Sequence, residues 1–95
     1  MILKMDNNVL NILREMLKGK DKPALRLLVK GFTWKGPVLG MVPDEKREND
    51  KEFSVKDVDF VVERDYEYLF NNATISYKKS AFGGKFEIMP EEIDL

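Results

Sequence analysis

The side chains that most often perform chemistry in proteins are missing from this sequence. The 95-residue chain contains neither cysteine nor histidine, so it has no thiolate nucleophile and no imidazole to act as a general base near neutral pH. Zinc sites built from cysteine and histidine, and Ser–His or Cys–His catalytic pairs, are excluded. The serines Ser54, Ser76 and Ser80 therefore have no histidine to activate them. We expect that the protein is not an enzyme and has no catalytic residue.

Carboxylates are the remaining candidates for ligand chemistry. Acidic side chains gather in residues 44–50 and near the C-terminus, at Glu91, Glu92 and Asp94, and oxygen donors suit hard cations such as Mg²⁺, Ca²⁺ or Fe²⁺. Basic residues interleave with the first group, and an acidic tail is far more often solvated charge than a metal site. We therefore expect a solvated surface loop at 44–50, and no metal ligands and no cofactor anywhere in the chain.

A third candidate is the loop GFTWKG, residues 31–36, which holds the only tryptophan, Trp34, between two glycines. The favoured interpretation is that the indole folds back and packs on Phe32 or Phe82, in which case Trp34→Ala would cost about 3–5 kcal/mol. The alternative is an exposed anchor for a partner, because tryptophan is a frequent interface hot spot. In that case the candidate interaction loop comprises Phe32, Thr33, Trp34 and Lys35.

Composition limits the classes of partner. The formal net charge is −1, from 16 basic and 17 acidic residues, which argues against a general electrostatic grip on nucleic acid. The apolar runs are shorter than the roughly 20 residues that a membrane helix needs, and the N-terminus lacks the pattern of a signal peptide. We expect one domain over residues 1–95, in the cytoplasm, with neither nucleic acid nor membrane as a partner.

The spacing of apolar residues predicts the elements that must position these candidates. Residues 7–19 have the spacing of an amphipathic helix, with Asp6 as its N-cap and Gly19 as its end. Strands follow at 24–30 and 38–42, separated by the loop at 31–37, and Pro43 is expected to end the second. The alternation in 24–30 places Leu25, Leu27 and Val29 on one side.

The second half of the sequence predicts more sheet. Residues 52–63 contain a strand whose Val58, Phe60 and Val62 face inward, and a short helix follows at 64–72. Two further strands are expected at 73–79 and 85–89, joined by a tight turn at 80–84. The inward residues of these last strands are Ala73, Ile75, Tyr77, Phe86 and Ile88. The sequence thus predicts a β-rich α+β domain.

The order of these elements and several local strings resemble the HesB/IscA-like family of A-type iron–sulfur cluster assembly proteins, over residues 3 to 90. The strings are LRLLVK after the first helix, GFTWKG at the place of the family's Gly-Cys-Ser-Gly loop, and GGKFEIMP at the end. The central stretch resembles the family's signature through Asp50, Phe53, Val61, Val62, Tyr68, Leu69, Ile75 and Tyr77. The resemblance implies an N-terminal amphipathic helix, a short second helix and small mixed sheets.

The departures from that family bear on function. Its members hold iron or a cluster through one cysteine in the loop and a Cys-Gly-Cys near the C-terminus, whereas this chain has Trp34 in the loop and no cysteine at all. Iron–sulfur clusters need thiolate or, less often, imidazole donors. The resemblance therefore implies a degenerate HesB/IscA-like domain that associates with cluster-assembly proteins or with itself, as a homodimer. The alternative is a small binding module unrelated to that pathway, with the Trp34 loop as its contact surface.

Overall fold

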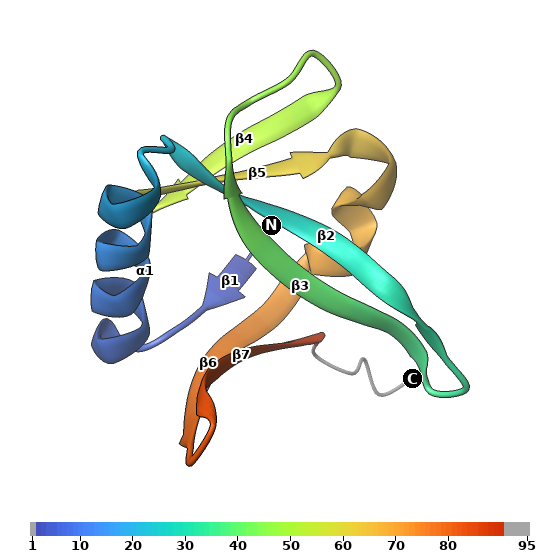
Figure 1. Ribbon diagram of the computed structural model, residues 1–95. Coiled ribbons are helices and arrows are strands. Elements are labelled where there is room, and N and C mark those ends of the chain that lie inside the picture. The colour runs from blue at the N-terminus through green and yellow to red at the C-terminus, as the bar shows by residue number, and fades with distance from the viewer. Residues whose placement is uncertain (1, 91–95) are drawn as a thin grey trace.

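The computed structural model describes residues 2–90, which form one α-helix, one 3₁₀ helix and seven strands (Figure 1). A four-stranded sheet has the order β3-β2-β5-β4, and a three-stranded sheet has the order β1-β6-β7. The expected β-rich α+β fold is confirmed. The elements are β1 (Ile2–Lys4), α1 (Asn7–Lys20), β2 (Ala24–Thr33), β3 (Gly36–Asp44), β4 (Asp50–Val55), β5 (Val58–Glu63), η1 (Arg64–Phe70), β6 (Asn72–Ser80) and β7 (Gly83–Pro90).

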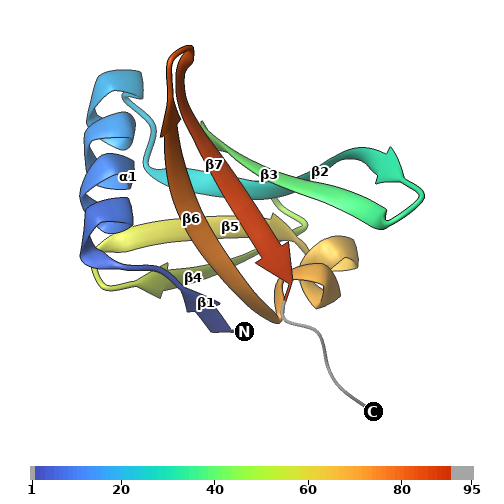
Figure 2. The same cartoon turned by 90° about the horizontal axis from the view of Figure 1, so that it is seen from below.

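The two sheets cross each other, and α1 lies along one side of both (Figures 1 and 2). The helix contacts β3, β5 and β6, so its apolar face closes the core that the sheets enclose. Most of this core comes from alternating strand positions. Its fully buried large side chains are Phe60, Phe70, Leu10, Leu13, Leu25, Leu27, Ile75, Val58, Val61 and Val62.

Helix α1 begins where the sequence predicts and ends slightly later. The Asp6 carboxylate accepts a hydrogen bond of 2.8 Å from the Val9 amide, which confirms the N-cap. The helix runs through Gly19 and ends at Lys20, and its C-cap is Asp21, whose φ of 52° is left-handed. The prediction of Gly19 as the end was wrong, because aspartate also tolerates this conformation and can provide the C-terminal cap.

The middle strands are longer and more numerous than the sequence indicates. Strand β2 continues past its predicted end to Thr33, and β3 begins before its predicted start, at Gly36. The expected loop at 31–37 is therefore a turn of two residues. Residues 52–63 form two strands, not one, joined by a turn in which Lys56 has a φ of 56°. Pro43 does not end β3, because a proline is tolerated in an edge strand where its missing N–H would face outward.

The last third of the described chain follows the prediction closely. The short helix is a 3₁₀ helix that ends at Phe70, two residues earlier than expected, and β6 and β7 pair antiparallel. Ala73, Ile75 and Ile88 are buried, and Tyr77 and Phe86 pack against the same core. The acidic residues at 91, 92 and 94 lie outside the described residues. No helix within residues 2–90 has the length and apolarity needed to span a membrane.

Candidate functional site

The candidate loop is the tip of a two-stranded arm formed by the ends of β2 and β3. Thr33 and Gly36 are the closing pair of the hairpin. The Thr33 hydroxyl donates to the Gly36 carbonyl at 3.2 Å and accepts from the Lys35 amide at 3.2 Å. Gly36 has a φ of 118°, a conformation that only glycine adopts readily. These features fix a turn of two residues, Trp34 and Lys35.

The indole of Trp34 projects into solvent from this turn. Trp34 is 91% exposed and Phe32 is 77% exposed, so the expected packing of Trp34 on Phe32 or Phe82 is wrong. The physical reason is the length of the turn, because two residues do not give the backbone enough reach to return a large ring to the sheet. The Lys35 ammonium lies 5.1 Å from the centroid of the Trp34 ring, within the range of a cation–π contact.

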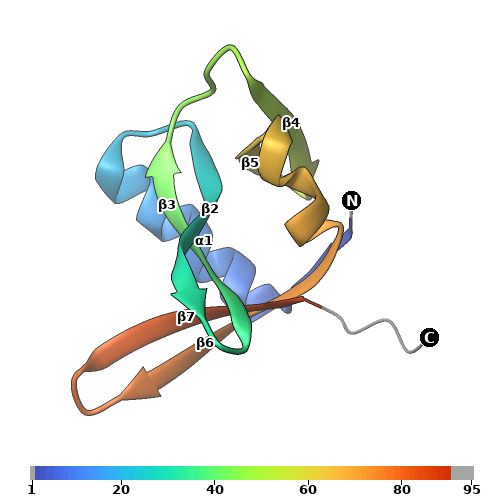
Figure 3. The same ribbon diagram turned by 90° about the vertical axis from the view of Figure 1, so that its right-hand side faces the viewer.

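The β6–β7 hairpin has a turn of the same construction. The Ser80 hydroxyl donates to the Gly83 carbonyl at 3.0 Å and accepts from the Phe82 amide at 3.2 Å. Gly83 has a φ of 115°, and Phe82 is fully exposed. The two tips end at separate places on the molecule (Figures 1 and 3). Phe82 is therefore an aromatic residue in a matched setting, against which the role of Trp34 can be compared.

At its other end, the arm is fixed by an ion-pair cluster that sequence reasoning missed. The Arg26 guanidinium on β2 donates to Asp44 at 2.6 Å and to both oxygens of Asp50, at 2.7 Å and 2.5 Å. The Arg47 amide donates to Asp50 at 2.7 Å. Asp50 is only 3% exposed. The prediction of a solvated loop at 44–50 was therefore wrong at both ends, because each aspartate begins or ends a strand and turns toward Arg26.

The ion-pair cluster of Arg26, Asp44 and Asp50 makes the free energy of unfolding depend on pH. Hydrogen bonds from Arg26 lower the pKa of Asp50 from 3.8 to about 2, and Arg26 also lowers the pKa of Asp44. A carboxylate whose folded pKa lies below its unfolded pKa stabilises the fold above the unfolded value, and that stability is lost as the pH falls through the folded value. We expect urea unfolding to show a loss of stability from about pH 4 down to about pH 2.

Variants identify the source of this acid sensitivity. Asp50→Asn should flatten the profile between about pH 4 and pH 2, because the titrating group is gone. Asp57→Asn is the control, since its ion pair with Arg14 is 2.6 Å long but its side chain is 69% exposed and well screened. An Asp50→Asn profile as steep as that of the parent chain would assign the acid sensitivity to other groups.

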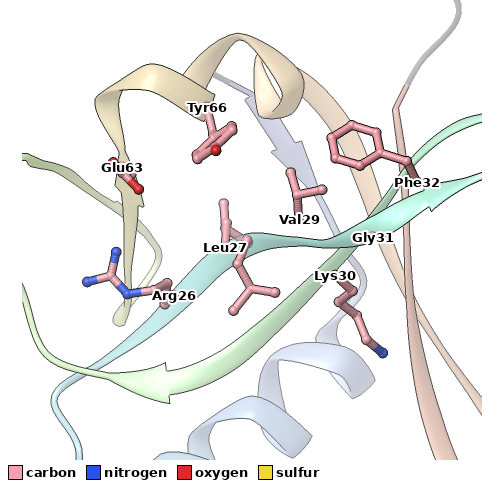
Figure 4. Close-up of a pocket in the computed structure, with 9 residues that line it drawn as sticks. Arg26, Leu27, Val29, Lys30, Gly31, Phe32, Glu63 and Tyr66 are labelled. Carbon is pink, nitrogen blue, oxygen red and sulfur yellow. The ribbon is translucent and has the colours of Figure 1, made fainter.

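A groove of about 240 Å³ runs beside the arm, between β2 and η1 (Figure 4). Val29 and Phe32 stand on the side of β2 that faces Tyr66 on η1, whereas Lys30 points the other way. Arg26 and Glu63 lie at the opposite end from Phe32. Phe32 thus belongs both to the predicted interaction loop and to this groove, which the sequence pattern did not reveal. The lining residues are Arg26, Leu27, Leu28, Val29, Lys30, Gly31, Phe32, Glu63 and Tyr66.

The donor atoms of this chain do not fit an iron–sulfur cluster. The turn of the β2–β3 arm presents the indole of Trp34, and the whole chain lacks cysteine and histidine. Within residues 2–90, acidic side chains form no group of three that could hold a metal ion. Asp44 and Asp50 each form an ion pair with Arg26.

Comparison with solved structures identifies the fold. A crystal structure of IscA with its [2Fe-2S] cluster superposes with a TM-score of 0.77 at 12% identity, over 94% of this chain and 85% of that one. The chain has the IscA fold. A solution structure of a protein from Aquifex aeolicus gives a TM-score of 0.71 at 22% identity, over 96% and 93% of the two chains. No protein-family model and no curated protein sequence matches this chain.

The IscA fold confirms the architecture that the sequence resemblance implied, from the opening helix to the final hairpin. At these identities the likeness establishes the fold, and the [2Fe-2S] cluster is a property of the IscA structure. In the present chain the fold carries an exposed aromatic tip, an ion-pair cluster that anchors the arm, and a groove between β2 and η1.

Proposed function

We propose that this protein is a protein-binding module built on the IscA fold, which does not carry a cluster through cysteine. Its contact surface is the tip of the β2–β3 arm, made by Phe32, Thr33, Trp34 and Lys35. The observation that supports this most is the exposure of Trp34, at 91%. Aromatic residues of this size contribute large contact areas to interfaces and lose little conformational entropy on binding.

The construction of the arm supports the same proposal. The indole is held out by a turn that needs Gly36, and the arm is anchored by a buried ion pair at its base. A contact residue on a short, fixed turn is presented in one place, which lowers the entropic cost of association. The partner is a second copy of this chain, in a homodimer, or another protein. Components of iron–sulfur cluster assembly are the first to test, because the fold is that of IscA.

A matched pair of variants tests the role of the tip. We expect Trp34→Ala and Phe82→Ala each to change the free energy of unfolding by less than about 0.5 kcal/mol, because both rings are exposed. Only Trp34→Ala should weaken association, by roughly tenfold or more. Sedimentation velocity over a concentration series measures self-association, and affinity capture with quantitative mass spectrometry measures recovery of other proteins.

The proposal predicts different association for the two variants. Loss of dimer or of captured partners with Trp34→Ala, and their retention with Phe82→Ala, supports the tip as the contact surface. Equal association of all three proteins would contradict the proposal, as would an equal loss with both variants.

A further inference from the structure

Strand β2 loses one of its two neighbours part-way along its length. It has ten residues, but it pairs with β5 only at Leu25, Arg26 and Leu27. Beyond that point β5 ends at Glu63 and the chain turns into η1. The rest of β2 is paired with β3 alone, so its other edge faces the groove beneath η1 (Figure 4).

The prolines of β3 reveal which peptide groups point to this open edge. In an antiparallel ladder, paired residues alternate between those that bond across the pair and those that point away from it. Pro43 lies opposite Leu25 and Pro37 lies opposite Phe32, and a proline, which has no N–H, fits a position that points away. The same alternation places the peptide groups of Leu25, Leu27 and Val29 on the β5 side.

Two outward residues have no β5 partner. The register of β2 against β3 shifts by one residue between Val29 and Gly31. After this shift, the next residue whose peptide groups point away from β3 is Phe32. Among residues 2–90, the backbone hydrogen bonds outside helices and ladders involve neither residue. Val29 and Phe32 therefore offer N–H and C=O groups to whatever lies in the groove.

Three other edge strands, β3, β4 and β7, carry features that discourage strand addition. Edge strands are protected by proline and by charged side chains. Strand β3 has Pro37 and Pro43, β4 has Lys51 and Glu52, and β7 has Lys85 and Glu87. On the open part of β2 the single charged residue is Lys30, and its side chain lies over Gly40 of β3, away from the groove. This edge is left available.

The walls of the groove indicate the chemistry of an occupant. Val29, Phe32 and the Tyr66 ring, which is 41% exposed, supply apolar surface. Arg26 at the far end is neutralised by two aspartates. Asp44 also pairs with Arg47. Glu63 beside Arg26 forms no ion pair within the part of the chain that the structure describes, so its own negative charge is uncompensated.

We propose that the open edge of β2 receives an extended peptide from a protein partner, which adds as a strand between β2 and η1. The peptide has apolar side chains at alternate positions and a lysine or arginine near its Glu63 end. Backbone hydrogen bonds to Val29 and Phe32 hold it, and the Tyr66 and Phe32 rings cover its apolar side chains. This inference rests on the proposed protein-binding function and gives the partner a chemical class.

Selection from a displayed library of random nine-residue peptides, with the intact chain as bait, tests the proposal. We expect enriched sequences with alternating apolar residues and one basic residue near an end. Phe32→Ala removes the ring, and Phe32→Pro removes the ring and the outward N–H, with Gly31 before it to accommodate the proline. A synthetic peptide of the enriched sequence should bind Phe32→Pro roughly tenfold more weakly than Phe32→Ala.

Further measurements separate the alternatives. Glu63→Gln should weaken binding of the basic peptide but not of a version in which the basic residue is replaced by alanine. Slowed hydrogen exchange at the Val29 and Phe32 amides of the parent protein, on adding the peptide, checks the hydrogen bonds without any variant. Retained peptide binding by Trp34→Ala would separate this edge from the tip and leave the present inference standing.

The overturning results are equally specific. A library that yields no binder, or peptides that bind Phe32→Pro and Phe32→Ala equally with no change in Val29 or Phe32 exchange, would exclude strand addition. Self-association would be the alternative use of this edge. It would be indicated if, with no peptide present, the parent chain is a dimer and Phe32→Pro is a monomer, because the second copy would then cover the open edge of β2.

Discussion

Replacing Asp50 by alanine should destabilise the fold by about 3–5 kcal/mol, a large share of the stability of a small domain. Asp50 is 3% exposed and accepts two hydrogen bonds from Arg26 and one from the Arg47 amide. Its removal leaves the Arg26 guanidinium, with an 11% exposed side chain, with Asp44 as its only carboxylate and the Glu45 carbonyl as its other acceptor. A buried charge that loses a partner costs far more than an exposed one. Urea unfolding, monitored by the circular dichroism of the backbone, measures the change.

Two further variants show whether buried charge is the cause. Asp57→Ala removes the partner of Arg14 at an exposed site and should leave the unfolding midpoint nearly unchanged. The double variant Arg26→Met with Asp50→Leu removes both charges and should recover part of the loss, because apolar replacements of a buried pair are often tolerated. An effect of Asp57→Ala as large as that of Asp50→Ala would contradict this explanation.

Anaerobic reconstitution with ferrous iron and sulfide should leave the protein without iron after desalting and without visible charge-transfer bands. The expected result follows from the donor set, since cluster irons are held by thiolate or imidazole and the chain has neither. Metal analysis and visible absorption give the readout, and a desalted sample treated without protein provides the background level.

Stoichiometric iron in the desalted protein would overturn this expectation. Ligation would then have to come from oxygen donors. The first residues to replace would be Glu91, Glu92 and Asp94, which lie outside the described residues. Retention of iron after their replacement would direct attention to the carboxylates within residues 2–90.

Local patterns predicted the elements whose contacts are local or strictly alternating. The N-cap at Asp6, the buried face of α1 and the inward residues of β6 and β7 all follow from spacing along the chain. The β4–β5 hairpin escaped detection, because its turn depends on the left-handed conformation of Lys56, which lysine rarely adopts. No glycine or asparagine marks that position.

The candidate site was only partly predictable for a different reason. Trp34 was identified as a candidate from its neighbours, but its exposure depends on the length of the turn, which the sequence did not set unambiguously. The Arg26–Asp50 pair joins residues 24 positions apart, and a charged residue in a run of charge looks solvated until its partner is known. The groove depends on where β5 ends relative to β2, which is a property of the assembled sheet.

The matched turns give this protein a natural place for a reporter. The β6–β7 tip is separate from the β2–β3 arm (Figure 3). Phe82 lies in its turn and is fully exposed. Because the chain contains no cysteine, Phe82→Cys would introduce a single thiol that a fluorophore or spin label could modify alone. Gly84 must be kept, since the Tyr77 ring occupies the space that a side chain there would need. The β6–β7 hairpin thus allows binding at the opposite arm to be followed without touching it.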